Sequence, residues 1–305
     1  MKIAVVGSYG VGMTMRVGRV PGPGETIVGG AYAAGPGGKG SNQAIAMARL
    51  GAQVSLLTAV GGDEMAQAAR ALWQREGVDA AHVVTATAPT MIGFILVDES
   101  GENRIVIAPG ALDELSPTHV EAFRGTIAEA DMLVVSMEIP LDAVGAALKI
   151  AREEHTRVLL NPAPAAVLPD AFWKLIDYLT PNESEAAILV GLPADHGLEY
   201  EELVARLRAV TDAVIVLTRG ANGAVVDDRN RVTVVSAIPA HRVLDTTGAG
   251  DSFTAALAVA LVDGLPLGAA VQQAVAAGSH AVTIAGVIDS LPRPQDIRNL
   301  MGRLP

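Results

Sequence analysis

The chain has 305 residues, of which 50% are hydrophobic, 18% are charged and only 3% are aromatic. This composition excludes a disordered protein, and the net charge of −11 argues against a nucleic acid or an anionic membrane as a partner. The absence of cysteine excludes disulfides, thiolate metal sites and a cysteine nucleophile, and it fits a protein of the reducing cytoplasm.

Short β-rich runs alternate with helical runs along most of the chain. Strands are predicted at Ile3–Val6, Val54–Thr58, Asp131–Ser136, Val158–Leu160 and Ala213–Leu217, and helices at Gly40–Leu50, Glu64–Glu76, Leu141–Glu154 and Ser252–Val262. Alternation of this kind predicts parallel strands that are joined by crossover helices. We expect an α/β fold of three layers, in which a doubly wound, mostly parallel sheet lies between helices.

Two regions, residues 13–34 and 90–107, break this alternation. In the second, Met91–Val97 and Arg104–Ile107 flank a polar loop at residues 98–103, which is typical of a β-hairpin. Extended segments without helices between them do not belong in a doubly wound sheet. We therefore expect a small second sheet, inserted into one domain of residues 1–305, that acts as a lid and keeps water away from a site on the core.

Two glycine-rich segments near the N-terminus differ from common nucleotide motifs. In a G-x-G-x-x-G pattern that starts at Gly10, Met15 stands where the last glycine belongs, which argues against an NAD-dependent dehydrogenase. Lys39 is followed by Gly40, where a P-loop requires serine or threonine. Lys39 and Asn42 instead carry groups that hydrogen-bond a polyhydroxyl substrate, and an ordinary tight turn before a helix is the alternative.

Polar residues also follow two later strands, at 161–165 and 180–185. Asn182 and Glu185 are one helical turn apart, so both can face one site, where Glu185 would hold the hydration shell of a magnesium ion. The same pair is typical of a helix N-cap with its capping-box glutamate. Both interpretations stay open.

The segment Asp245–Asp251 joins a glycine-rich turn to the start of a long helical run. Free backbone N–H groups and the positive end of the helix dipole meet at such a point and form an anion site. The Asp251 carboxylate beside it makes chemical sense when it takes a proton from a hydroxyl that attacks a phosphoryl group held in the anion site. A plain helix start with an acidic first turn is the alternative.

These segments together resemble a known family. Gly37–Ala44 and Asp245–Phe253 are similar to the two signatures of the PfkB family of ribokinase-like carbohydrate kinases, and Pro23–Thr26, Asn161–Ala165 and Thr180–Glu185 match ribokinases in the same order. The resemblance covers essentially the whole chain. It implies a ribokinase-like fold, a β-sheet lid that often pairs with its twin in a homodimer, and transfer of phosphate from ATP to a sugar hydroxyl, expected to be primary.

The resemblance also assigns roles to individual residues. It implies that Asp251 is the catalytic base and that the amides of Gly248, Ala249 and Gly250 form the anion hole. It implies sugar contacts for Gly38, Lys39, Asn42 and Glu138, and contacts with ATP and magnesium for Asn182, Glu185, Thr218 and Gly220. A monovalent cation, potassium, is implied at Asp245, at the carbonyls of Thr247, Ala281, Ile284 and Gly286, and at the Ser290 hydroxyl.

One departure from ribokinases concerns the acceptor. Ribokinases have an Asn-x-Asp whose aspartate grips two ribose hydroxyls, and Gly10 and Gly12 stand at these positions here. A charged hydrogen bond of about 1.5–3 kcal/mol is therefore missing, so ribose itself is in doubt. We expect the glycines to leave extra room for a bulkier or differently hydroxylated acceptor. A nucleoside kinase of the same fold is the alternative, and the intact Asp251 argues against a protein that only binds its ligand.

Overall fold

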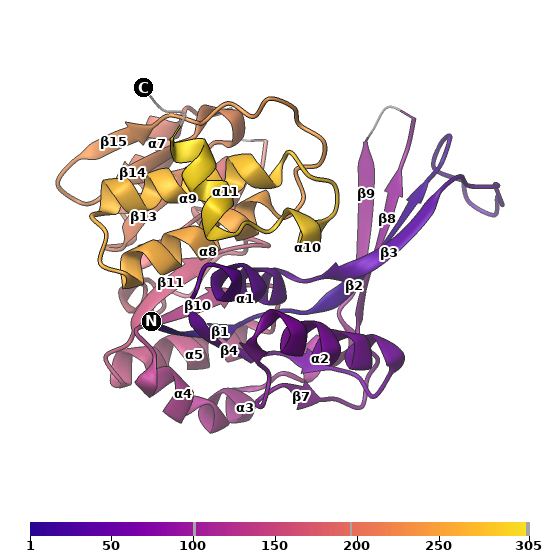
Figure 1. Cartoon of the computed structure of the whole chain (residues 1–305), viewed down its shortest axis with the longest axis horizontal. Helices are drawn as coiled ribbons and strands as arrows, with labels where there is room; N and C mark the ends of the chain where they lie inside the picture. The colour runs from indigo at the N-terminus through magenta and orange to yellow at the C-terminus, as the bar shows by residue number, and fades with distance from the viewer. Residues whose placement is uncertain (100–101, 196, 303–305) are drawn as a thin grey trace.

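A nine-stranded sheet forms the centre of the computed structural model, which describes residues 1–99, 102–195 and 197–302 (Figure 1). Its strand order is β15-β14-β13-β12-β11-β10-β1-β4-β6. In this sheet, β13, β12, β11, β10, β1, β4 and β6 are parallel to their neighbours. The last two strands, β14 and β15, are antiparallel and form one edge. The bounds are β1 Lys2–Val6, β4 Gln53–Leu57, β6 Val78–Asp79, β10 Met132–Ser136, β11 Arg157–Asn161, β12 Tyr178–Leu179, β13 Val214–Thr218, β14 Ala224–Asp227 and β15 Val232–Val235.

Helices cover both faces of this sheet, because successive strand residues point to opposite sides. Ile3 and Val5 pack into one apolar cluster, whereas Ala4 and Val6 pack into the other. The first cluster contains residues of α1 (Lys39–Arg49), α2 (Glu64–Glu76), α8 (Ala249–Val262), α9 (Leu267–Ala281) and α11 (Pro294–Met301). The second contains residues of α3 (Pro117–Ala122), α4 (Arg124–Glu129), α5 (Leu141–Glu153), α6 (Glu183–Leu189) and α7 (Tyr200–Arg208). The predicted three-layer α/β fold is confirmed.

Most predicted elements differ from the observed ones by one or two residues, and α2 has the predicted bounds. The Asp63 carboxylate caps its first turn by accepting the Ala66 N–H at 2.9 Å, and Gly77 ends it with a φ of 75°. The exception is α8, which begins three residues before the predicted Ser252, at Ala249. Shorter elements are α10 (Val287–Ser290), the two-residue strands β5 (Ala59–Val60) and β7 (Val84–Thr85), and 3₁₀ turns at Gly110–Glu114, Trp173–Leu175 and Gly220–Asn222.

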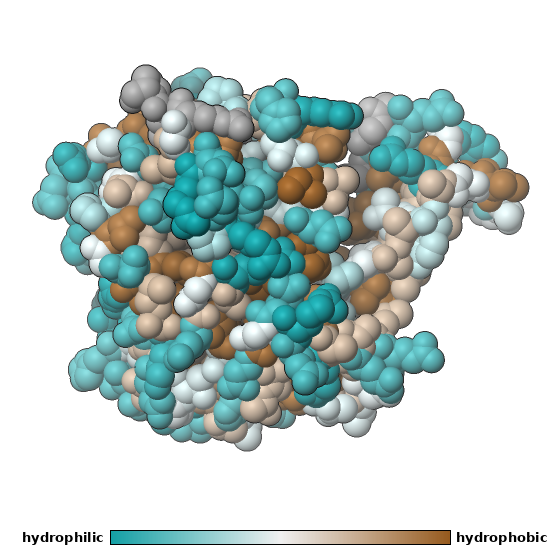
Figure 2. Space-filling model, in the orientation of Figure 1, coloured by the Kyte–Doolittle hydropathy of each residue, from teal (hydrophilic) through white to brown (hydrophobic). Residues whose placement is uncertain are grey.

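A separate four-stranded sheet projects from this body (Figure 1). Its order is β3-β2-β8-β9, with β2 Gly10–Arg16, β3 Tyr32–Gly37, β8 Met91–Val97 and β9 Asn103–Ala108. Figure 2 shows it standing out on the right, with an open space between it and the body near the top of the view. Ser100 and Gly101 of the predicted hairpin loop lie outside the described residues. None of the helices in the described ranges has the length and hydropathy of a transmembrane segment.

Candidate functional site

The first turn of α8 lies at the carboxyl ends of the central strands. Gly248 precedes it with a φ of 81°, a backbone conformation that favours glycine. The first helical hydrogen bond runs from Ser252 N–H to the Gly248 carbonyl at 2.8 Å, and the Ala249 N–H donates to Thr246 O at 3.3 Å. The amides predicted for the anion hole are those of Gly248, Ala249 and Gly250, and the Ala249 N–H is already bonded in this way. The N–H groups of Gly250 and Asp251 precede the first helical bond and lie at the positive end of the helix dipole, where an anion is favoured.

Asp251 is 8% exposed and is held by two amide side chains of α1. Asn42 Nδ2 donates to its Oδ2 at 2.8 Å, and Gln43 Nε2 donates to its Oδ1 at 3.0 Å. Burial raises the pKa of Asp251, and the charge of Lys39 and the two amide bonds only partly oppose this. A carboxylate of raised pKa, fixed beside an anion site, has the properties of a general base.

Lys39 and Glu138 lie close to Asp251. We call these three residues, together with the polar side chains bonded to them, the polar cluster. Lys39 Nζ is 3.9 Å from Glu138 Oε1, and the Lys39 N–H donates to Glu138 Oε2 at 3.0 Å. Burial lowers the pKa of Lys39, but Asp251, Glu138 and Glu185 outweigh burial and the pKa is raised, so its ammonium stays charged. The structure therefore brings together the predicted sugar contacts Lys39, Asn42 and Glu138.

Gly38, Gly10 and Gly12 differ in the space that a side chain would find at each position. Gly38 has a φ of 91°, and a Cβ on it would lie 2.5 Å from Tyr9 Cα. A Cβ on Gly10 would lie 2.2 Å from Met91 Cε, so the extra room that we expected at Gly10 is occupied by Met91. A Cβ on Gly12 would have its nearest neighbour, Ile95 Cδ1, at 3.7 Å, so room remains there.

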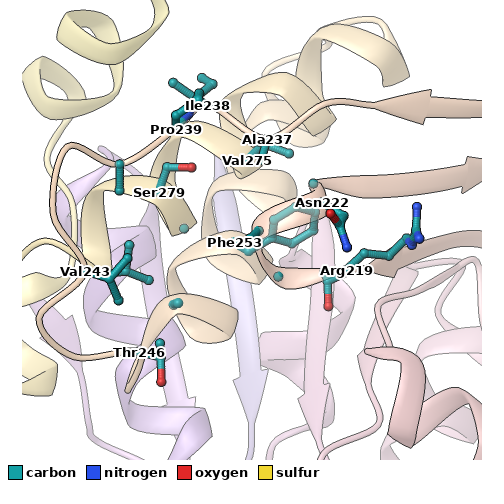
Figure 3. A pocket seen from close by; sticks show the side chains of 18 of the residues that line it. Arg219, Asn222, Ala237, Ile238, Pro239, Val243, Thr246, Phe253, Val275 and Ser279 are labelled. Atoms are coloured by element: carbon teal, nitrogen blue, oxygen red, sulfur yellow. The ribbon is translucent and has the colours of Figure 1, made fainter.

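A cavity of about 970 Å³ lies at the N-terminus of α8, on the side away from the polar cluster (Figure 3). Ala249 and Gly250 line it, as do the predicted ATP contacts Thr218 and Gly220. The remaining walls are largely apolar, with polar groups at the edges, which suits a nucleotide base and its sugar. Figure 3 shows these walls, formed among others by Ile238, Val243, Phe253 and Val275, with Arg219 and Asn222 at one side.

Asn182 and Glu185 form the capping box that was the alternative interpretation. Asn182 Oδ1 accepts the Glu185 N–H at 2.7 Å, and Glu185 Oε2 accepts the Asn182 N–H at 2.8 Å. Burial raises the pKa of Glu185, Lys39 opposes this and Asp251 adds to it, so Glu185 also faces the polar cluster. A β-bridge pairs Asn182 with Thr218, which places both beside the cavity.

The Asp245 carboxylate organises the loop before α8. Its Oδ1 accepts the N–H and the hydroxyl of Thr247 at 2.9 and 2.6 Å, and its Oδ2 accepts the Gly286 N–H at 3.1 Å. Burial raises the pKa of Asp245, but these bonds outweigh burial and the pKa is lowered. A Cβ on Gly248 would lie 3.4 Å from Ser290 Oγ, so Ser290 lies beside the residue that precedes α8, and Asp245 links Thr247 with Gly286 in the same region. Ala281 and Ile284 share one turn nearby, in which the Ala281 carbonyl accepts the Ile284 N–H at 3.2 Å.

The sequence analysis gave no role to three residues of the cluster. Gln43 Nε2 donates to Asn161 Oδ1 at 2.9 Å as well as to Asp251, and Asn161 Nδ2 donates to Thr180 O at 3.0 Å. The Ser8 hydroxyl donates to Glu138. Gln43 and Asn161 lie in segments that the sequence singles out, but the roles of all three residues depend on contacts between distant parts of the chain.

Comparison with known proteins agrees with this geometry. The model of the pfkB family carbohydrate kinases matches residues 2–294. A ribokinase of Haemophilus influenzae is 34% identical and a deoxyribokinase of Salmonella typhimurium 33% identical, each over 96% of both chains. The structure of an Arabidopsis thaliana ribokinase complexed with ribose and ATP has a TM-score of 0.91 at 28% identity, covering 100% of this chain and 99% of that one. The chain therefore belongs to the pfkB family of carbohydrate kinases and is an ATP-dependent sugar kinase of the ribokinase type.

Proposed function

We propose that this kinase transfers the γ-phosphoryl group of ATP to a hydroxyl of a sugar, expected to be primary, at the N-terminus of α8. One observation carries the proposal: this helix end separates the cavity from the polar cluster. Ala249 and Gly250 line the cavity, and the next residue, Asp251, is bonded to Asn42 in the cluster. Donor and acceptor would thus meet at one point, and transfer would depend on positioning and electrostatics.

Asp251 acts as the base in this proposal. Its carboxylate accepts the proton of the attacking hydroxyl, while the amides of Asn42 and Gln43 fix its orientation. The backbone N–H groups at Gly248 and Gly250, joined by that of Asp251, stabilise negative charge on the phosphoryl group as it moves, whereas the Ala249 N–H, also predicted for this role, donates to Thr246 O. Gly38, Lys39, Asn42 and Glu138 bind the acceptor, and Lys39 brings a positive charge to the cluster.

Asn182, Glu185, Thr218 and Gly220 serve ATP and Mg²⁺ in this proposal. One Glu185 oxygen belongs to the capping box and the other is left for a water of a hydrated ion, which fits the preference of Mg²⁺ for few protein ligands and several waters. In the described part of the chain, no three acidic or histidine side chains form a metal site by themselves, so phosphate oxygens would be needed as ligands. When bound, Mg²⁺ neutralises charge on the phosphates.

We also place a potassium ion at Asp245, with the carbonyls of Thr247, Ala281, Ile284 and Gly286 and the Ser290 hydroxyl. These groups are all oxygen donors, and the lowered pKa of Asp245 keeps its carboxylate ionised, so they fit a hard cation. Ser290 Oγ donates to Val287 O at 2.8 Å, which leaves its lone pairs available. The ion would add positive charge beside the anion site and stiffen the loop before Gly248.

The small sheet is proposed to be both lid and dimer interface. Its register places Met15 beside Tyr32, and Phe94 beside Met13 and Val106, on one face. Tyr32, Phe94 and Val106 are well exposed on this outer face, and contiguous exposed apolar surface marks a site of association. A second copy of the chain would cover it. A cytoplasmic location stays a prediction from the sequence.

The test is ATP consumption, followed as ADP release, with a panel of pentoses, hexoses, sugar alcohols and nucleosides, in Mg²⁺ with K⁺ or Na⁺. We expect turnover with a pentose-sized sugar, since the relatives are named ribokinase and deoxyribokinase, and faster turnover in K⁺. Turnover with nucleosides alone would support the alternative kinase. A rate indifferent to the monovalent cation would remove the potassium site.

A further inference from the structure

Among the described residues, one face of the small sheet carries no hydrogen-bonding side chain at its end nearest the polar cluster, and the first one along β2 is Thr14, which lies beside Ile95. The register places Gly10 beside Met91 and Gly12 beside Gly93 and Gly35, with Ile95 two residues further along β8. Residues paired in this way point to the same side of a sheet. We call this surface the glycine face, formed by Gly10, Gly12, Gly35, Met91, Gly93 and Ile95.

The end of the glycine face at Gly10 lies near the polar cluster, because Gly10 pairs with Gly37, two residues before Lys39. Met91 packs in the same apolar cluster as Met137 and Ile139. These two residues flank Glu138, which binds the Lys39 N–H. Val11, which points to the opposite side of β2, packs instead against the other apolar cluster. The glycine face is therefore one wall of the space in which the acceptor would lie.

Met91 and Gly12 determine the shape and polarity of this wall. Met91 is 7% exposed, and its Cε lies 2.2 Å from the place of a Cβ on Gly10, so its thioether fills the volume that a side chain at position 10 would need. Gly12 leaves room for a Cβ, which would lie 3.7 Å from Ile95 Cδ1 and 4.0 Å from Gly35 O, both ordinary contact distances. Neither Gly10 nor Gly12 has a positive φ, so the backbone itself does not require glycine at either position.

The two sides of the acceptor space thus differ in polarity. On the cluster side, Lys39, Glu138 and Asn42 offer charges and amide groups, and the buried Asn42 Oδ1 has no hydrogen-bond partner among the described residues. On the glycine face the backbone groups of β2 are paired in the sheet ladder with β3 and β8. A sugar hydroxyl turned to this wall would lose its bonds to water without replacement, which is unfavourable.

We propose, on the basis of the phosphoryl transfer proposed above, that the preferred acceptor turns a side without hydroxyls toward the glycine face. The substrate class is a deoxy sugar, or a sugar with an apolar substituent, that keeps its hydroxyls toward Lys39, Asn42 and Glu138. Met91 and Gly12 are the residues that determine this specificity.

The test compares D-ribose with its 2-deoxy and 3-deoxy derivatives by kcat/KM, and by calorimetric binding of each sugar. We expect at least one deoxy sugar to equal or exceed ribose with the wild-type enzyme. Gly12→Asp, which returns a carboxylate to this wall, should shift the ratio toward ribose by about 10- to 100-fold, as expected for a hydrogen bond to a charged group. Gly12→Ala is the matched control, because it adds bulk without charge and should keep the ratio near the wild-type value.

Preference of the wild-type enzyme for ribose over every deoxy sugar, with a ratio that Gly12→Asp does not change, would overturn this inference and leave the kinase activity standing. Absence of both turnover and binding for all sugars would instead overturn the proposed function. A test of the Met91 contact needs no substrate. Gly10→Ala should lower the melting temperature, and it should lower it less in a Met91→Ala background, because the nearest neighbour of the new Cβ is then absent; an equal effect in both backgrounds would contradict the contact.

Discussion

At the scale of single residues, the Asp251 carboxylate has the position of a catalytic base, but its surroundings disfavour the ionised form. It is buried, and burial raises its pKa. For an acid whose pKa is raised by folding, the ionised form costs stability once the pH is above the unfolded pKa, so removal of the charge does not destabilise the protein at neutral pH. Function and stability therefore make opposite demands at this position.

Asp251→Asn tests this conflict. Loss of the base should lower kcat by about 10²- to 10⁴-fold. The melting temperature should stay within a few degrees of the wild-type value or rise, because a buried charge is removed and Gln43 Oε1, which has no hydrogen-bond partner in the described part of the chain, can accept a hydrogen bond from the new amide. Steady-state ADP release and calorimetry measure the two effects. Near-normal turnover would refute the role of Asp251 as the base.

Gln43 is expected to be a positioning residue for Asp251. Gln43→Met keeps the volume but removes the donor to Asp251 Oδ1, so the pKa of Asp251 should rise further. The acidic limb of the kcat/KM profile should then move to higher pH, whereas a structural defect would lower the rate equally at all pH values. Gln74→Met, an exposed change of the same kind on α2, is the control and should leave the profile in place.

The sequence predicted part of this cluster and missed the rest for a physical reason. Lys39, Asn42 and Asp251 stand in recognisable glycine-rich segments, so the chemistry of those segments pointed to them. The bond between Gln43 and Asp251 joins residues 208 positions apart. The contact of Met91 with Gly10 depends on the register of two strands, and a pattern within one segment contains no information about either.

At the scale of elements, Asp63 connects the start of α2 to the base of the small sheet. Its carboxylate accepts the Ala66 N–H at 2.9 Å and the Thr90 N–H and hydroxyl, both at 2.8 Å. Thr90 immediately precedes β8. Burial raises the pKa of Asp63, but these bonds outweigh burial and the pKa is lowered. One side chain thus caps a helix and anchors the strand that carries Met91.

Asp63→Ala should lower the free energy of unfolding by about 1–3 kcal/mol, since it removes an N-cap and leaves the donors of Thr90 unpaired. KM for the sugar should rise as well, because β8 loses its anchor. Urea unfolding at neutral pH and sugar kinetics measure the two effects. Equal stability of variant and wild type would show that the anchor contributes nothing.

The pH dependence gives an independent check of the same contact. A lowered pKa means that the contribution of Asp63 is present above its unfolded pKa, near 3.8, and is lost as the pH falls through the folded pKa below that value. The difference in unfolding free energy between the wild type and Asp63→Asn should therefore shrink below about pH 3.8. A difference that is constant from neutral to acidic pH would contradict an ionised Asp63.

Element boundaries were predictable wherever a cap residue is local. Gly77 ends α2 as expected because its φ of 75° is a property of that residue and its immediate neighbours. The start of α8 was predicted too late, since Gly248 bends the chain and Ala249 can already be helical after it. The pairing of β14 and β15 and the order of the small sheet were not predictable, because strand order is decided by packing between elements.

At the scale of the whole molecule, the two faces of the small sheet have different proposed roles, one in acceptor binding and one in association. The glycine face lines the acceptor space, and the outer face exposes Phe94 and Val106. A dimer through the outer face would hold the sheet in place from behind. Association and acceptor binding should then be coupled, because an unpaired sheet would close over the sugar less firmly.

Val106→Asp is expected to break this dimer. Val106 is 70% exposed on β9, and a carboxylate buried at its position in an apolar interface would lose its hydration. Light scattering should give twice the chain mass of 31.3 kDa for the wild type and the single chain mass for the variant at the same concentration. KM for the sugar should rise in the variant more than kcat falls, since Asp251 and the anion site belong to the body.

The matched control for this prediction is Val232→Asp. Val232 is a valine of similar exposure, 56%, but it lies on β15 at the edge of the central sheet and far along the chain from the small sheet. It should keep the wild-type mass and KM, because it adds the same charge without touching the outer face. A wild-type enzyme that is monomeric throughout, or a Val106→Asp variant that stays dimeric, would exclude the outer face as the interface. Loss of the dimer without any change in KM would separate association from acceptor binding and leave the sheet as a lid that closes on its own.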